Sequence, residues 1–230
     1  MPVVLVVDIG GSHVKIMHSG APDRRKMPSG RDLTAQSMVD GVKRLAADWR
    51  YQAVSIGFPG PVLHGRPVHE PHNLGTGWVG FDFNAAFGRP VKLINDAAMQ
   101  ALGSYEGGRM LFLGLGTGLG SAMIVDGRIE PMELAHLPYR KHTYEHYVGE
   151  QARQRKGNKK WRRTVEQVVD QLRAALEPDY VVIGGGNVRH LHALPSGVRR
   201  GDNRNAFLGG FRLWDAPAAA ADGCSAPRPA

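Results

Sequence analysis

Two glycine-rich turns in the sequence have the composition of loops that bind anions. Asp8-Ile-Gly-Gly-Ser-His13 follows an apolar run, and Leu115-Gly-Thr-Gly-Leu-Gly120 lies between two more. Glycines let backbone N–H groups approach a phosphate closely, and the hydroxyls of Ser12 and Thr117 add donors. A tight β-hairpin is the alternative interpretation of the first turn. The second turn is not a Walker loop, because no Gly-Lys-Ser/Thr follows, and it is a poor dinucleotide fingerprint, because a strand comes next.

Acidic residues stand at three places beside these turns. Asp8 ends the first apolar run, where a carboxylate can hold a metal-bound water. In Leu93-Ile-Asn-Asp96, Asp96 is either the N-cap of a helix or a general base that takes a hydroxyl proton in a phosphoryl transfer, with Asn95 binding a second hydroxyl. In Met132-Glu-Leu-Ala-His136 one helical turn puts the acid and the imidazole on one face. That pair can grip vicinal hydroxyls or a metal ion; the alternative is an exposed Glu beside a core-edge His.

The elements that must position these residues alternate between strands and helices. Short β-type runs predict strands at 3–7, 13–17, 53–56, 91–94, 110–113, 121–125 and 180–183. The pattern also predicts helices at 33–48, 97–105, 143–155 and 161–176. Continuous apolar runs are typical of strands covered on both faces, so the sequence predicts a layered α/β fold.

The composition fits a folded protein with an anionic partner. Of 230 residues 42% are hydrophobic, and Lys+Arg 29 against Asp+Glu 21 gives a net charge of +8. Such a balance indicates a nucleic acid, another polyanion or a phosphorylated substrate. Most of it lies in 140–163, where nine Lys/Arg stand against two Glu, and this polar segment is predicted to be loosely structured. Few aromatic residues interrupt the segment, so support for nucleic acid is weak.

The sequence also predicts a cytoplasmic protein with no membrane partner. The single cysteine, Cys224, excludes an intrachain disulfide and a Cys-based zinc cluster. We find neither a signal peptide nor a run of about 20 apolar residues. The Ala/Pro-rich segment 216–230 is predicted to be a disordered tail, in which Cys224 has no catalytic role.

Taken in order, the motifs resemble those of the ROK sugar kinases and repressors, within the actin-like ATPase superfamily. The resemblance covers residues 3–190 and includes the motifs quoted above. It extends to Gly57-Phe-Pro-Gly-Pro-Val62, Asn73-Leu followed by Trp78, Thr143-Tyr-Glu-His-Tyr147 and Gly184-Gly-Gly-Asn187. The spacing from Asn73 to Trp78 and the stretch Asn158-Lys-Lys-Trp161 are most similar to the polyphosphate glucokinase branch.

The resemblance implies a kinase that transfers a phosphoryl group from polyphosphate, ATP or both to the 6-hydroxyl of glucose or a similar hexose, with Asp96 as general base. Sugar-binding positions fall on Asn73, Asn95, Asp96, Glu133, His136 and Glu145. Positions for the phosphates or nucleoside of the donor fall on Asp8, Gly10, Gly11, Ser12, Gly116, Thr117, Gly118, Gly184, Gly185 and Gly186. Mg²⁺ is expected at Asp8, through water. The basic segment is either a track for a polyphosphate chain or a solvated face.

Departures from the family pattern narrow the prediction. Most members carry a cysteine-rich zinc motif after the Glu…His pair, whereas 136–142 holds no cysteine, so we predict no zinc, as in the polyphosphate branch. Ala135 stands where Gly is usual, and an early end of the chain predicts a shortened C-terminal helix. Family repressors carry a helix-turn-helix ahead of the first motif, for which the few residues before Asp8 leave no room. A sugar sensor without catalysis is the alternative function.

For the architecture, the resemblance implies the actin-like (ribonuclease H-like) α/β fold with two lobes and a central cleft. We expect a small lobe at 1–94, with 203–215 packing back on it, and a larger lobe at 95–202. The sugar is expected in the cleft, where lobe closure would exclude water. Family members are commonly dimers, so we expect a homodimer.

Overall fold

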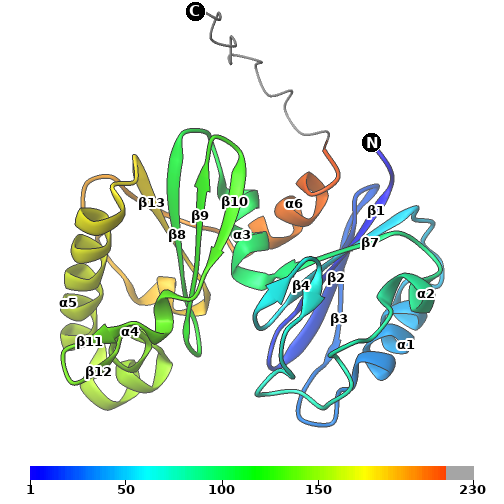
Figure 1. Cartoon of the computed structure of the whole chain (residues 1–230), viewed down its shortest axis with the longest axis horizontal. Coiled ribbons are helices and arrows are strands. Elements are labelled where there is room, and N and C mark those ends of the chain that lie inside the picture. The colour runs from blue at the N-terminus through cyan, green and yellow to red at the C-terminus, as the bar shows by residue number, and fades with distance from the viewer. Residues whose placement is uncertain (216–230) are drawn as a thin grey trace, which may run out of the picture.

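Two five-stranded sheets form the two halves of the molecule, and two helices lie between them (Figure 1). The structure is a computed structural model that describes residues 1–215. The tail predicted at 216–230, with Cys224, lies outside the described residues.

The N-terminal sheet has the strand order β3-β2-β1-β4-β7. Its strands are β1 (Val4–Ile9), β2 (His13–His18), β3 (Ala21–Pro28), β4 (Ala53–Phe58) and β7 (Val91–Asn95). β1, β4 and β7 are parallel, and β2 is antiparallel to both β1 and β3. Leu5 packs with α1 (Ala35–Leu45) and α2 (Phe83–Phe87) on one face, and Val6 packs with α6 (Asn205–Arg212) on the other. Burial on both faces explains the continuous apolar run of β1.

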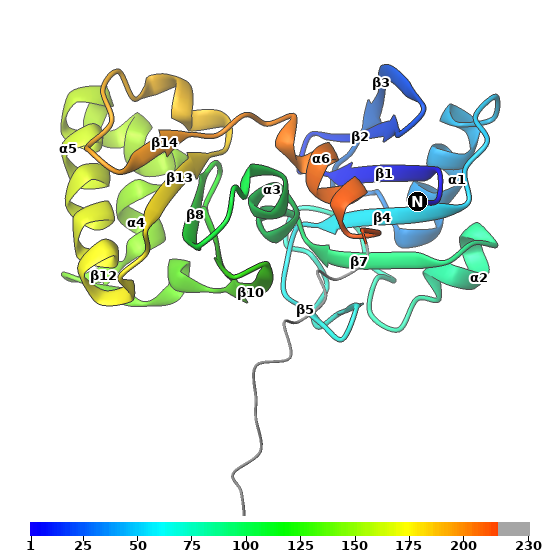
Figure 2. The ribbon, with the colours of Figure 1, turned by 90° about the horizontal axis from the view of Figure 1, so that it is seen from above.

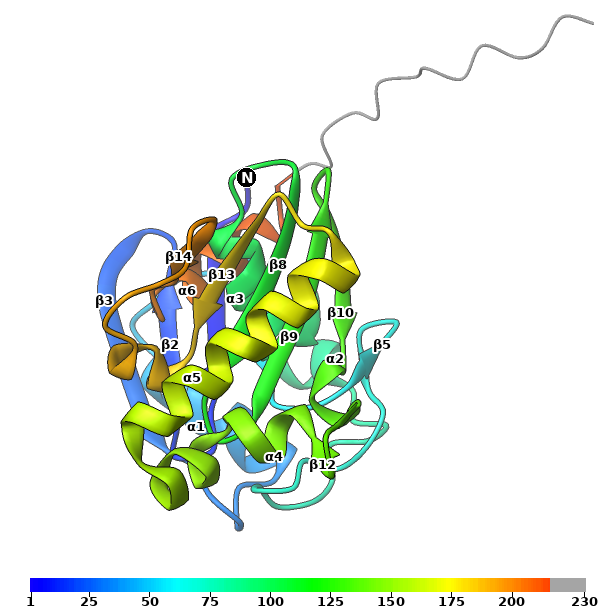
Figure 3. The same ribbon diagram turned by 90° about the vertical axis from the view of Figure 1, so that its left-hand side faces the viewer.

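The second sheet has the strand order β10-β9-β8-β13-β14. Its strands are β8 (Arg109–Leu115), β9 (Leu119–Val125), β10 (Arg128–Met132), β13 (Tyr180–Gly184) and β14 (Val198–Arg200). The helix α5 (Glu150–Leu176) crosses its outer face (Figure 3), where Leu111 packs with Val165. The helix α3 (Asp96–Ser104) covers the face toward the other sheet, where Phe112 packs with Ala97.

Most of the segment predicted to be loosely structured is helical, so that prediction is wrong. The helix predicted at 143–155 covers α4 (Tyr144–Val148) and the beginning of α5. The helix predicted at 161–176 lies in the second part of α5, which is kinked at Gly157 (φ 73°, ψ 158°). Trp161 is fully buried and its indole N–H donates to the carbonyl of Val148 at 2.8 Å. One apolar stripe therefore anchors the helix while its many charges face outward.

The helices α3 and α6 join the two sheets (Figure 2). They cross so closely that a Cβ on Gly209 would lie 1.7 Å from the carbonyl oxygen of Met99. Arg212 donates to the carbonyls of Leu102 and Tyr105, at 2.8 and 3.0 Å, and so ties α6 to the end of α3. The division of the chain into lobes at 1–94 and 95–202 stays a prediction.

The remaining elements are short. They are β5 (Val62–Leu63), β6 (Arg66–Pro67), β11 (Pro138–Tyr139), β12 (His142–Thr143) and the 3-10 turns η1 (Leu134–His136) and η2 (Gly186–His190). Within residues 1–215, no helix has the length and apolar character needed to cross a bilayer.

Candidate active site

A cavity of about 980 Å³ lies between the two sheets and draws its lining from both. It sits where β1 and β7 end and α3 begins. Every candidate residue from the sequence analysis lines it except Gly184. The structure thus brings together residues from 8 to 186 at one site, although the role of each one stays a prediction.

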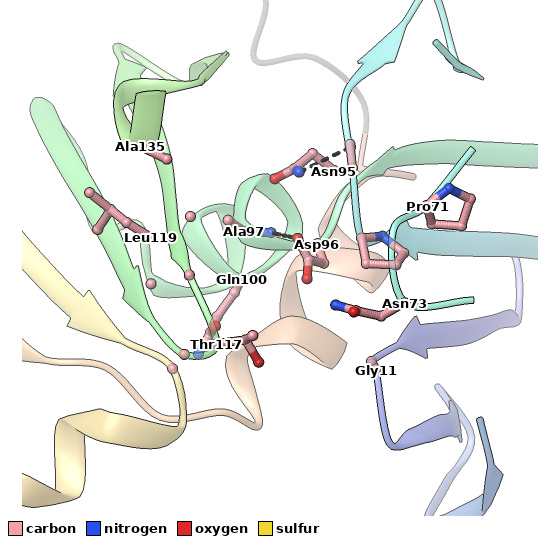
Figure 4. A pocket seen from close by; sticks show the side chains of 18 of the residues that line it. Gly11, Pro71, Asn73, Asn95, Asp96, Ala97, Gln100, Thr117, Leu119 and Ala135 are labelled. Atoms are coloured by element: carbon pink, nitrogen blue, oxygen red, sulfur yellow. Dashed lines mark hydrogen bonds between the residues drawn. The ribbon is translucent and has the colours of Figure 1, made fainter. Parts of the chain in front are cut away.

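Asp96 lies at the floor of this cavity, at the start of α3 (Figure 4). The N-cap is its neighbour Asn95, whose side-chain oxygen accepts the N–H of Ala98 at 3.1 Å. The side chain of Asp96 accepts the N–H of Ala97 at 2.8 Å. Burial, followed by the negative charge of Asp8, raises the pKa of Asp96 to about 7. A carboxylate with such a pKa can accept a proton near neutral pH.

The predicted sugar-binding residues surround Asp96. The amide of Asn73 points into the cavity from the N-terminal half, and Asn95 donates to the carbonyl of Gly60 at 3.1 Å (Figure 4). Glu133 precedes a 3-10 turn that ends at His136, where an α-helical turn was predicted, and their Oε2 and Nε2 atoms are 3.8 Å apart. Burial raises the pKa of Glu133, against the opposing effect of His136.

Glu145 links this end of the cavity to the second glycine turn. Its Oε2 accepts the N–H of Leu119 at 3.2 Å. A Cβ on Gly118 would lie 1.9 Å from the same oxygen, so only glycine leaves room for this carboxylate. The turn and the acid are therefore fitted to each other, and a change in one must move the other.

The first glycine turn is the hairpin between β1 and β2, so the hairpin interpretation is confirmed. The turn also lines the cavity, and its Gly10 N–H donates to the carbonyl of His13 at 3.0 Å. The register pairs Asp8 with Lys15, and the ammonium lies 3.3 Å from the Asp8 carboxylate. The motif Gly184-Gly-Gly-Asn187 packs on the second glycine turn, because the side chain of Asn187 donates to the carbonyl of Gly116 at 3.0 Å.

Asp8 fits a magnesium ion that keeps most of its water. Mg²⁺ in phosphoryl-transfer sites is commonly held by one or two carboxylates together with water and substrate phosphate. Asp8 faces the cavity beside the first glycine turn and supplies one such carboxylate. Among residues 1–215, no three His, Cys, Asp or Glu side chains are grouped as a metal cage would require.

The sequence analysis missed several residues of the cavity. Lys15 and Arg189 are its only Lys or Arg among the described residues, and none of the nine in 140–163 lines it. Glu150, at the start of α5, donates its N–H to the carbonyl of Gly116 at 3.1 Å. The bidentate guanidinium of Arg153, at 2.6 and 2.9 Å, lowers the pKa of Glu150 to about 2.

A comparison with protein families accounts for this arrangement. The sequence model of the ROK family matches residues 4–131. The chain belongs to the ROK family.

Similar sequences to this ROK protein include sugar kinases. Polyphosphate glucokinase of Mycobacterium tuberculosis is 25% identical in an alignment of 202 positions that covers 78% of this chain and 76% of that enzyme. The bifunctional enzyme NanE/NanK of Brucella melitensis is 30% identical in an alignment of 143 positions that covers 55% of this chain. The match spans only 27% of that longer protein.

Solved structures show the same fold. The inorganic polyphosphate/ATP-glucomannokinase of Arthrobacter sp. strain KM superposes with a TM-score of 0.78 at 26% identity, covering 90% of this chain and 96% of that one. A ROK glucokinase of Streptomyces griseus, solved with glucose and AMPPNP, gives 0.73 at 17% identity, covering 92% and 98%. The predicted family and actin-like α/β fold of this ROK protein are thereby confirmed.

Proposed function

We propose that this ROK protein is a sugar kinase that transfers a phosphoryl group from polyphosphate, ATP or both to the 6-hydroxyl of glucose or a similar hexose. The observation that carries the proposal is Asp96. Within the described residues its carboxylate has no cation partner, its pKa is raised to about 7, and it lies between the sugar-binding candidates and the glycine turns. The similarity to polyphosphate glucokinase and to the glucomannokinase supports the same reaction.

In this proposal the sugar is held by polar side chains from both halves of the molecule. Asn73 and Asn95 reach it from one side, and Glu133, His136 and Glu145 from the other. Asp96 orients the 6-hydroxyl and takes its proton as the oxygen attacks the terminal phosphorus of the donor. Such positioning and proton transfer contribute roughly 10² to 10⁴ in rate.

The donor lies over the glycine turns in the same proposal. Backbone N–H groups of Gly11, Ser12, Thr117 and Gly118 would face the transferring phosphoryl group, and Gly184, Gly185 and Gly186 would border the far end of the donor. Asp8 would hold Mg²⁺ through water, and the ion would neutralise the charge that develops on the phosphates. Lys15 and Arg189 add positive charge inside the cavity. The basic face of α5 would contact only a donor long enough to leave the cavity.

The test is a transfer assay on the purified protein with glucose and Mg²⁺, with polyphosphate and ATP in parallel and Asp96→Asn as the control. If the wild type turns over and Asp96→Asn does not, the protein is a sugar kinase. The donor that supports turnover then shows whether the kinase depends on polyphosphate, on ATP or on both. No turnover with either donor, followed by sugar binding in a panel of hexoses, would instead establish a sensor. We also propose that the protein is a homodimer, which size-exclusion chromatography tests.

A further inference from the structure

Glu70 holds two backbone groups at the far end of the loop that carries Asn73. The N–H of Trp78 donates to both of its carboxylate oxygens, at 3.2 and 3.1 Å, and the N–H of Val79 donates to one of them at 3.2 Å. Hydrogen bonds to a carboxylate are stronger than those between neutral groups. Glu70 therefore closes the ten-residue segment 70–79 into a loop with fixed ends.

The closed end of this loop is anchored in the core. Trp78 is fully buried, and its ring lies 5.6 Å from that of Phe58. Its indole N–H donates to the carbonyl of Gly75 at 2.9 Å, and the N–H of Gly75 donates to Leu33 at 3.0 Å. The second half of the loop is thus tied to both the sheet and the start of α1.

Asn73 itself has no such support. Within residues 1–215, its side chain makes no hydrogen bond, so that its place in the cavity is set by the backbone of the loop. The loop passes beside the first glycine turn, where a Cβ on Gly11 would lie 3.9 Å from the Cβ of Asn73. Any change in the frame of the loop therefore moves Asn73 relative to Asp96.

We propose that Glu70 is a positioning residue for the sugar: it fixes the loop so that Asn73 faces Asp96, and it does not bind the sugar itself. The inference rests on the proposed function. Glu70 lines the cavity, but both of its oxygens are engaged by backbone N–H groups. A displacement of about 1 Å in a substrate-positioning group can cost as much as a hundredfold in activity.

The test compares sugar affinity, measured by calorimetry without donor, in wild type, Glu70→Ala, Asn73→Ala and the double variant. We expect Glu70→Ala to weaken the sugar Kd about tenfold or more and to leave the donor KM within about twofold. If Glu70 acts through Asn73, its removal has little further effect once Asn73 is alanine. A residue that merely stabilises the fold would weaken binding equally in both backgrounds.

Asp179→Ala is the matched control, because Asp179 also accepts a backbone N–H, that of Arg109 at 2.7 Å, but lies outside the cavity. Its sugar Kd should equal that of wild type. Glu70→Gln keeps the size of the side chain and one acceptor oxygen, so it replaces Glu70→Ala in the binding test if Glu70→Ala does not fold. Its sugar Kd should also weaken, with faster hydrogen exchange of amides in 71–79.

Two outcomes overturn the inference, and they are distinguishable. Wild-type sugar affinity in both Glu70 variants, or equal losses with and without Asn73, would refute the role of Glu70 and leave the kinase standing. Failure of the wild type to bind any hexose would remove the proposed function and this inference with it.

Discussion

Two carboxylates in the same cavity have opposite electrostatic surroundings. Asp96, at the floor, is half-buried with no cation partner among residues 1–215, and its pKa is raised to about 7. Glu150 lies at the rim where α5 begins. It accepts hydrogen bonds from Arg153, and its pKa is lowered to about 2. The floor therefore offers a group that can exchange a proton near neutral pH, whereas the rim offers a fixed negative charge. Proton transfer is the role that we propose for the first, and structural support is the role that we propose for the second.

The largest expected effect is on turnover when the floor carboxylate is removed. Asp96→Asn keeps the size of the side chain but cannot take the proton of the sugar hydroxyl, so kcat should fall by roughly 10² to 10⁴. Sugar affinity should change much less, because the amide still hydrogen-bonds. Steady-state assays together with calorimetry separate the two quantities. If kcat of the variant were close to that of wild type, another group would have to act as the base.

A smaller effect is expected at the glycine turn between floor and rim. In Gly118→Ala the new methyl would lie 1.9 Å from Oε2 of Glu145, which must leave the N–H of Leu119. We expect the sugar KM to rise roughly tenfold, as for other displaced positioning groups. Sugar KM in Glu145→Ala, with and without Gly118→Ala, provides the check. If the glycine acts through Glu145, the second substitution adds little.

The local motifs of the floor were predictable from sequence, and the rim was not. Asp96 and the glycine turns each follow a strand directly, so a short stretch of sequence fixes their place at a strand end. Lys15 had a weaker signal: a hairpin with the four-residue loop 10–13 pairs it with Asp8 by register. Glu150 reaches the cavity only because α4 and the kinked α5 fold back on the turn at 116–118, which no local pattern shows.

The same comparison explains why the basic segment was wrongly predicted to be loosely structured. Counting charges in 140–163 left open a track for polyphosphate and a solvated face, and it gave no direction for any side chain. In the structure Arg153 pairs with Glu150, and Lys156 lies over the ring of Tyr147 at 4.2 Å. The net charge of a segment does not depend on where its side chains point. A binding site on α5 does, because only the residues on one face of the helix can contact the same ligand.

The free energy of unfolding should show how much the ionised carboxylate of Asp96 destabilises the folded state. Because its folded pKa of about 7 exceeds the ordinary value of 3.8, the folded state loses stability as pH rises from about 4 through 7. Asp96→Asn cannot ionise, so it should be more stable than wild type at pH 8 by about 1–2 kcal/mol, an effect moderated by contact with water in the cleft. Denaturant unfolding at pH 8 and pH 5 measures the difference, which should shrink at the lower pH. A variant less stable than wild type at pH 8 would mean that the ionised carboxylate is compensated.

The smallest effect is expected at the rim, and its sign is opposite. The folded pKa of Glu150, about 2, lies below the ordinary value of 4.5, so its stabilisation is complete above about pH 4.5 and is lost as pH falls toward 2. Glu150→Gln should therefore lower Tm at pH 7, and the difference should narrow in acid. The decrease should be only a few degrees, because Glu150 and Arg153 are 27% and 18% exposed and exchange with water. If both substitutions shifted Tm in the same direction at pH 7, the two carboxylates would share one environment, and Asp96 would lose its distinction as the base.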